Sequence, residues 1–443
     1  MKTNIKKPAL LLISSCCFTV AYSQKEIKSD TLHISLQEAW KKAESHSRQI
    51  EIQKKNTEIS EAEVRDAKME RLPELGVKGN IEKASNIPVY ENGLFHKPTQ
   101  HEVIHTLYKV GADLYLNLYN GNKTNLKIKE EKTIHQISEI KQNQTISDIH
   151  YTTASLYLDL QKSIIFKKLI IEDIEDQEKQ LKEIVAFHKN GTVLKSDVLR
   201  VELELSRRKL ALTTINNDIL IASQKLNIIM GEPDERLVLP NLPKNDWEEK
   251  TTYEDYLAMA LQHSFPYHIS EQKTELSKIN LKQVRANVAP KVGLYSEFYF
   301  ANPQIFLYPY NPYLYSLGVV GLKASFPISA LYHNINKVKA AELEFEKEEE
   351  AHKDTEDKVR QEVKEAYLRY KEALEQIKVA KVNETHAKEN ARIIKNTYFN
   401  QTSLITDLLD ADIQVLQTRF ELASAQILAQ DKYYLLQNII GIL

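Results

Sequence analysis

The chain has very little cysteine: of its 443 residues only Cys16 and Cys17 are cysteines. Both lie in an N-terminal segment with three lysines, an apolar stretch and a small-residue cleavage site, which together are typical of a secretory signal peptide. We therefore predict a signal peptide over residues 1–23. The mature chain then has no cysteine, which excludes disulfides and thiol chemistry. Lipidation of Cys16 is the alternative fate of this segment.

A strong charge of one sign and a long apolar run are also missing. The formal net charge is −2, and loss of the three lysines of the signal peptide makes it −5. Such a charge predicts neither nucleic acid nor an anionic membrane surface as a partner. After residue 24 no run of 18 apolar residues occurs, so no transmembrane helix is predicted. Only β-strands, whose pattern is weaker, remain as a route into a membrane.

The usual motifs of catalysis are absent as well. The mature sequence contains no HExxH, no GxGxxG, no Walker loop and no pair of cysteines. We therefore expect no enzyme activity, no cofactor and no metal site. His46 and His263 recur at equivalent places near helix ends, where packing explains a lone histidine better than metal ligation does.

Proline and glycine are missing from long stretches, and this predicts very long helices. Proline is absent from 99–232 and 328–443, and glycine from 122–190, 192–230 and 322–440. These stretches are rich in residues that favour helices, and both breakers are excluded from helix interiors for backbone reasons. A helix over 122–189 would be about 100 Å long.

The sequence also repeats itself, which indicates a tandem duplication. Two offsets, 217 and 210, align the halves, and the pairs that match best are Ala43/Ala260, His46/His263, Pro73/Pro290, Gly76/Gly293, Tyr157/Tyr367, Asn190/Asn400, Asp197/Asp407 and Gly231/Gly441. We predict a first repeat over 34–231, with strands at about 74–119 and long helices at about 122–230. The second repeat spans 251–441, with strands at about 291–327 and long helices at about 332–440.

The predicted strands alternate between apolar and polar residues. In 107–119, for example, Tyr108, Val110 and Leu114 point one way, and Lys109, Gly111 and Asp113 point the other. Each half has two such strands. Four strands cannot close on themselves, and an open edge in a bilayer leaves backbone groups unpaired. Several copies of the chain are therefore needed to complete one barrel.

The long helices carry the apolar 3-4 spacing of a coiled coil. In the first repeat this spacing runs from Val198 to Ile229, and Arg208 is its one polar interruption. In the second repeat it runs from Leu408 to Ile439. Such seams predict partner helices.

This order of elements resembles the TolC family of outer-membrane efflux channels. The resemblance covers about residues 34–441, and it is carried by "ISLQEAWKKAESHSRQI" with "RLPELGV", by "FHKNGTVLKSDVLRVE" with "YFNQTSLITDLLDAD", and by the helix ends "LNIIMG" and "LQNIIG". It implies a mainly α fold with a β-barrel part. Three copies would form a trimeric 12-stranded outer-membrane barrel, continued by a coiled-coil α-helical tunnel that extends far into the periplasm.

The resemblance also implies a function and partners. The homotrimer would be the passive exit channel of a tripartite efflux or type I secretion system, held in outer-membrane lipid. A periplasmic adaptor (membrane fusion) protein and an inner-membrane pump would dock on it and open it. The alternative is a soluble periplasmic coiled-coil scaffold or adaptor, which would need the helices but not the strands. The exported substrate does not follow from the sequence.

Site residues follow from the resemblance in the same way. The turns between the long helices would be the periplasmic tips that dock the adaptor, at Gly191, Thr192, Val193, Leu194, Thr402 and Leu404. Asp407 and Asp410 would line the pore gate, and Asp197, Tyr398 and Ser403 would tie neighbouring helices in the closed channel. Ser403 stands where the family has an arginine, and Gln401 where it has a glycine. Aspartates in the first turns of a helix also favour its positive end, and this structural role competes with the gate, most of all for Asp197 and Asp412.

Overall fold

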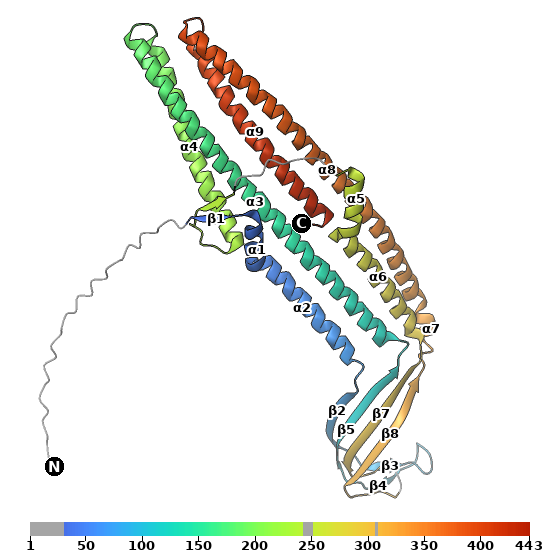
Figure 1. Cartoon of the computed structure of the whole chain (residues 1–443). Helices are drawn as coiled ribbons and strands as arrows, with labels where there is room; N and C mark the ends of the chain where they lie inside the picture. Colours follow the sequence, from blue (N-terminus) through green and yellow to red (C-terminus); the bar gives the residue numbers. More distant parts are fainter. Residues whose placement is uncertain (1–30, 242–250, 306–308) are drawn as a thin grey trace, which may run out of the picture.

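The computed structural model describes residues 31–241, 251–305 and 309–443, so the predicted signal peptide lies outside the described residues. The molecule is elongated, with long helices side by side over most of its length and a sheet at one end (Figure 1). None of the helices in the described ranges has a segment long and apolar enough to cross a bilayer.

Four long helices dominate the molecule: α3 (Lys123–Lys189), α4 (Lys195–Met230), α8 (Ile335–Phe399) and α9 (Ile405–Ile440). With 67 residues, α3 is about 100 Å long. The helix α4 packs back along α3, α9 packs back along α8, and α3 lies against α9. A short helix α7 (Ala330–His333) precedes α8 and is separated from it by Asn334.

Shorter helices precede each long pair, namely α1 (Leu36–His46), α2 (Arg48–Met69), α5 (Tyr253–His263) and α6 (Phe265–Arg285), the last continued by a 3₁₀ turn (Ala286–Val288). A single serine breaks each pair. Ser47 and Ser264 both have extended backbone, and each is the C-cap residue of one helix and the N-cap residue of the next. The Ser47 hydroxyl accepts the Ile50 N–H at 3.4 Å, which is the usual role of an N-cap serine.

One antiparallel sheet has the strand order β2 (Glu74–Lys83), β5 (Thr106–Tyr119), β7 (Lys291–Asn302) and β8 (Tyr315–Ser325). Its register places apolar residues opposite one another on one face: Val77 lies opposite Ala112, Ala112 opposite Phe298, and Leu294 opposite Leu322. Many of these side chains are exposed, Val77 at 82% and Val320 at 74%. The expected combination of long helices with a sheet that has one apolar face is thus confirmed.

The other face of the sheet is polar. Lys78 pairs with Asp113 at 3.0 Å, and Lys109 pairs with Glu297 at 2.6 Å. Tyrosines on this face lie flat over glycines of the neighbouring strand. A Cβ at Gly293 would come within 2.5 Å of the Tyr115 ring, so only glycine allows this close approach.

Two pairs of very short strands were not expected. β1 (Leu32–Ile34) pairs in parallel with β6 (Val238–Pro240), and β3 (Ile87–Val89) pairs with β4 (Thr99–His101) within a predicted loop. Tyr157 of α3 fixes the first pair, because its hydroxyl donates to the Ile34 carbonyl at 3.1 Å and accepts the Asn241 N–H at 2.9 Å.

Separate apolar clusters hold the helices together. The largest joins β1, α1, β6, α3 and α4 around Tyr157, Leu160 and Leu226, and a second joins α5, α8 and α9 around Val363, Tyr367 and Leu436. His46 packs on the end of α4, because a Cβ at Gly231 would lie 2.5 Å from its ring. This agrees with the packing role expected for that histidine.

Candidate functional site

The turn between α3 and α4 is a compact tip. Gly191 has φ +75°, and the Thr192 N–H and hydroxyl both donate to the Phe187 carbonyl, at 3.0 and 2.8 Å. Gly191, Thr192 and Leu194 are exposed, Leu194 at 70%. Val193 was expected to be exposed as well, but it is half-buried and packs against the apolar cluster beneath the tip.

The turn between α8 and α9 has the same geometry. Gln401 takes the left-handed position with φ +66°, and Thr402 donates twice to the Thr397 carbonyl, both times at 2.9 Å. Thr402 and Leu404 are exposed, Leu404 at 68%. Both predicted docking tips therefore present one exposed leucine next to one exposed threonine.

The two tips lie against each other in the same chain. The rings of Phe187 and Phe399 have centroids 5.5 Å apart. Beneath them, Ile184 and Val201 from the first hairpin form one cluster with buried residues of the second hairpin, namely Tyr398, Ile405, Leu408 and Leu409. The hairpins are thus joined at their ends as well as along α3 and α9.

Asp197 and Asp407 have the same local role. Each accepts the backbone N–H of the residue that precedes its helix, from Leu194 at 3.3 Å and from Leu404 at 3.0 Å. Asp410 lies one turn further along α9 and is exposed. Asp407 and Asp410 therefore share an exposed face of α9, and only Asp407 also caps the helix.

Among the described residues, those expected to tie the closed helices together make no hydrogen bond between the two hairpins, although Tyr398 packs in the apolar cluster that joins them. The Ser403 hydroxyl accepts from Thr397 Oγ1 at 3.1 Å, inside its own tip. Tyr398 is 7% exposed, and its hydroxyl has no hydrogen-bond partner among the described residues. Burial, and to a lesser degree the nearby charge of Asp197, raise the pKa of Tyr398. This phenol is a buried donor that still lacks an acceptor.

Asp412 joins two helices, a role that the sequence did not reveal. It lies in the second turn of α9 and accepts hydrogen bonds from the amides of Gln177 and Gln180 of α3, both at 3.0 Å. Both glutamines are buried, at 2% and 3% exposure. Asp412 is therefore a bridge between α9 and α3 and not a helix-start residue.

The polar interruption of the α4 seam is explained by a buried ion pair. Arg208 is 5% exposed and pairs with Asp173 of α3, and it also bonds Glu204 at 3.4 Å. Burial raises the pKa of Asp173, although Arg208 acts in the opposite direction. Arg419 of α9 pairs with the adjacent Glu172 at 2.5 Å. Sequence spacing could not reveal Asp173 and Glu172 as partners, because both lie on another helix, α3.

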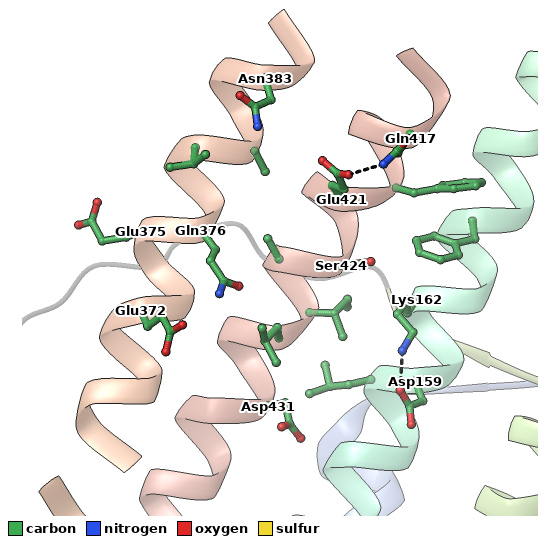
Figure 2. A pocket seen from close by; sticks show the side chains of 18 of the residues that line it. Asp159, Lys162, Glu372, Glu375, Gln376, Asn383, Gln417, Glu421, Ser424 and Asp431 are labelled. Atoms are coloured by element: carbon green, nitrogen blue, oxygen red, sulfur yellow. Dashed lines mark hydrogen bonds and ion pairs between the residues drawn. The ribbon is translucent and has the colours of Figure 1, made fainter. Parts of the chain in front are cut away.

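A groove of about 960 Å³ lies between α3, α8 and α9 (Figure 2). The three helices run side by side there, with α9 in the middle. The groove was not foreseen, because its lining comes from three segments that are far apart in the sequence.

Comparison with known proteins agrees with this geometry. Residues 258–442 match the family described as outer membrane efflux protein. The family is one of channels and not of enzymes. No curated protein matches the chain.

Solved structures of outer membrane proteins and channels share the fold over most of the chain. The outer membrane protein VceC from Vibrio cholerae is 15% identical, with a TM-score of 0.74 over 92% of this chain and 96% of that one. CusC is 14% identical, with a TM-score of 0.76 over 92% of both chains. The open state of the MtrE outer membrane channel from Neisseria gonorrhoeae is 14% identical, with a TM-score of 0.69 over 92% of this chain and 88% of that one. The resemblance inferred from the sequence is confirmed.

Proposed function

We propose that this chain is the outer-membrane exit channel of a tripartite efflux or type I secretion system. It acts as a passive conduit with a long periplasmic extension. The observation that carries the proposal is the sheet: four antiparallel strands with an exposed apolar face, joined directly to helices about 100 Å long. A soluble periplasmic scaffold, the other candidate, would gain nothing from such a face, since exposed apolar surface of this kind promotes aggregation in water.

Closure of the sheet requires more than one copy. β2 and β8 are edge strands, and their outer backbone groups have no neighbour within the four-stranded sheet. In a bilayer each unpaired group costs several kcal/mol. Three copies would supply twelve strands, and because each copy has an even number, neighbouring edges meet antiparallel as the rest of the sheet does. The four long helices of each copy would then continue the barrel as a tunnel.

The tips support docking of a periplasmic adaptor that couples the channel to an inner-membrane pump. Leu194 and Leu404 are exposed at the end furthest from the sheet, where an apolar side chain needs a partner to leave water (Figure 1). Asp407 and Asp410 on the adjacent turns would then line the gate, and the buried hydroxyl of Tyr398 would find its acceptor in a neighbouring copy.

The test measures whether the chain is recovered in the outer membrane and whether it conducts ions. The full-length chain, expressed with its signal peptide, should fractionate with the outer membrane, migrate on gels as a heat-modifiable trimer and conduct ions in planar bilayers. Cells that lack it should retain the substrates of its pump. Recovery as a soluble periplasmic monomer without conductance would instead identify a scaffold.

A further inference from the structure

The groove between α3, α8 and α9 opens on one particular side of the helices. Tyr157 of α3 points to β1 and β6, whereas Asp159 and Lys162, which line the groove, lie roughly half a turn around the helix. On α8, Tyr367 faces α5, and the groove residue Gln376 lies about 180° away. The groove therefore faces away from the layers built by α1, β1, β6 and α5. Since those layers would obstruct a duct, they belong on the outside of a helical tube, and the groove faces its interior.

The floor of the groove is apolar and aromatic. Phe166 of α3 and Phe420 of α9 stack with ring centroids 4.4 Å apart. Val379 of α8, which is 58% exposed, and Ile427 and Leu428 of α9 line the same groove. The face of an aromatic ring attracts both apolar groups and cations.

The rim of the groove is mainly acidic. Carboxylates come from all three helices: Asp159, Glu372, Glu375, Glu421 and Asp431. Lys162 is the one basic side chain of the lining within the described residues, and it pairs with Asp159 at 2.9 Å. Figure 2 shows Glu372 and Gln376 pointing from α8 toward α9, and Glu421 bonded to Gln417.

Other basic residues partly balance this charge from outside. Arg369 pairs with Glu372 at 2.9 Å and Lys378 with Glu375 at 2.7 Å, both along the exposed surface of α8. Asp431 contacts Lys432 at 3.1 Å and also the Tyr151 hydroxyl. Burial of this hydroxyl, together with the negative charge of Asp431, raises the pKa of Tyr151 to about 12. Among the residues that the structure describes, Glu421 bonds only the neutral Gln417, so its charge remains available to a ligand.

We propose that this groove binds hydrophobic organic cations on their way through the channel. An aromatic and aliphatic floor with carboxylates on its rim is complementary to a molecule that is apolar in body and positive in charge. The volume of about 960 Å³ is at the upper end of the range for drug-sized ligands. The proposal rests on the channel function, since only a duct brings such molecules past this surface.

Two ions of the same shape and opposite charge provide the test. Tetraphenylphosphonium and tetraphenylborate are titrated calorimetrically into the purified trimer in detergent, with protein-free detergent as the blank. Tetraphenylphosphonium should bind at a saturable site, more weakly as salt rises, and tetraphenylborate should not. Glu372→Gln combined with Glu421→Gln should weaken the binding about five- to tenfold, as expected for two partly screened charges.

Control variants test whether the cation binds in the groove. Glu346→Gln combined with Glu349→Gln removes two exposed carboxylates of α8 outside the groove and should leave binding unchanged. Ser424→Trp fills the groove without removing a charge and should abolish binding. Equal binding of both ions, equal loss in both double variants, or no binding above the blank overturns the proposal. Bilayer conductance of the same preparations separates this failure from failure of the channel function.

Discussion

Gly191 and Gln401 occupy the same left-handed backbone position in the two tips, with φ +75° and +66°. Glycine adopts this conformation freely, whereas a residue with a Cβ does so at a cost of about 1 kcal/mol. Gln401 is exposed, so contacts of its side chain do little to offset this cost. Gln401→Gly should therefore raise the thermal midpoint of the helical circular dichroism signal, and Gly191→Ala should lower it.

The matched comparison is Gly441→Ala. Gly441 also has a positive φ, but a Cβ there would come within 2.2 Å of the His263 carbonyl oxygen, whereas Gly191 has nothing within 4 Å. The loss should therefore be clearly larger for Gly441→Ala. If both variants lose the same thermal stability, backbone strain alone determines the loss and the clash with His263 adds nothing.

Asp410 separates the gate hypothesis from a purely structural role. Asp407 accepts the Leu404 N–H at the start of α9, so its removal lowers helix stability whatever else it does. Asp410 is exposed on the same face and is not part of that cap. Asp410→Asn should reduce the cation selectivity of single channels and their block by divalent cations, without lowering the thermal midpoint. Three such carboxylates near one axis would attract cations.

Asp197→Asn is the control, because Asp197 has the same capping geometry in the first hairpin. It should lower stability slightly and leave selectivity unchanged. If Asp410→Asn leaves both selectivity and block at their original values, the acidic turn of α9 is not the gate.

Individual residue roles could be predicted where they depend on neighbours in sequence. The aspartate three residues after each tip leucine indicated a helix start, and both aspartates do cap their helices. Asp412 was misjudged because its partners, Gln177 and Gln180, are more than 200 residues away. The spacing along one helix carries no information on such contacts.

At the level of elements, the buried Arg208–Asp173 ion pair joins α4 to α3. A variant without this ion pair should have a stability that depends on pH. Arg208→Leu leaves the Asp173 carboxylate buried beside Glu204 and Asp412, which should cost about 3–5 kcal/mol near pH 7. Thermal midpoints of the variant, measured at pH 7.5 and pH 4.5, are the test.

The sign of this pH dependence follows from Asp173. Burial raises its pKa in the folded chain, and loss of Arg208 removes an opposing effect and raises it further. A carboxyl with a raised folded pKa stabilises the fold while protonated, and this contribution is lost as pH rises through that pKa. The variant should therefore recover part of its stability at pH 4.5. Arg207→Leu, which removes the exposed neighbour that bonds the same Glu204 at 2.6 Å, should have little effect at either pH.

A second prediction for elements concerns the tips. Leu194→Asp places a charge on the exposed apolar side chain of the first tip, which an apolar partner surface would have to desolvate. Export of pump substrates should fail, while recovery from the outer membrane stays normal. Phe95→Asp alters a fully exposed apolar side chain in the loop between β3 and β4, at the other end of the molecule, and should not affect export. Normal export by Leu194→Asp would count against docking at this tip.

Long elements were predictable and short ones were not. The absence of glycine and proline over 122–189 predicted a single helix there, and α3 spans Lys123–Lys189. β1 and β6 have three residues each, too few for a periodic pattern, and they pair across about half of the chain. Their pairing depends on Tyr157, which the sequence marks only as a repeated tyrosine.

For the whole molecule, the decisive feature is the pair of open sheet edges. β2 and β8 flank β5 and β7, so about 14 Å separates the two edges within one chain. A disulfide requires Cβ atoms about 3.8 Å apart, and the edges of one chain cannot form one across two intervening strands. In the proposed trimer, however, β8 of each copy lies next to β2 of the following copy.

Cysteines placed on both edges should therefore link copies and not close within a chain. Val77→Cys in β2 is combined in turn with cysteines along β8, such as Ser316→Cys, Val320→Cys and Leu322→Cys, which lie on the same apolar face. Loss of the signal peptide leaves the mature chain without other cysteines. Oxidation in isolated outer membranes should yield covalent trimers for the pair in register and monomers for Val77→Cys alone. Ala112→Cys with Phe298→Cys, which are directly opposite on the internal strands, should give only a bond within the chain. Monomers from every edge pair would show that β2 and β8 do not meet between copies, and the sheet would then need another partner for its edges.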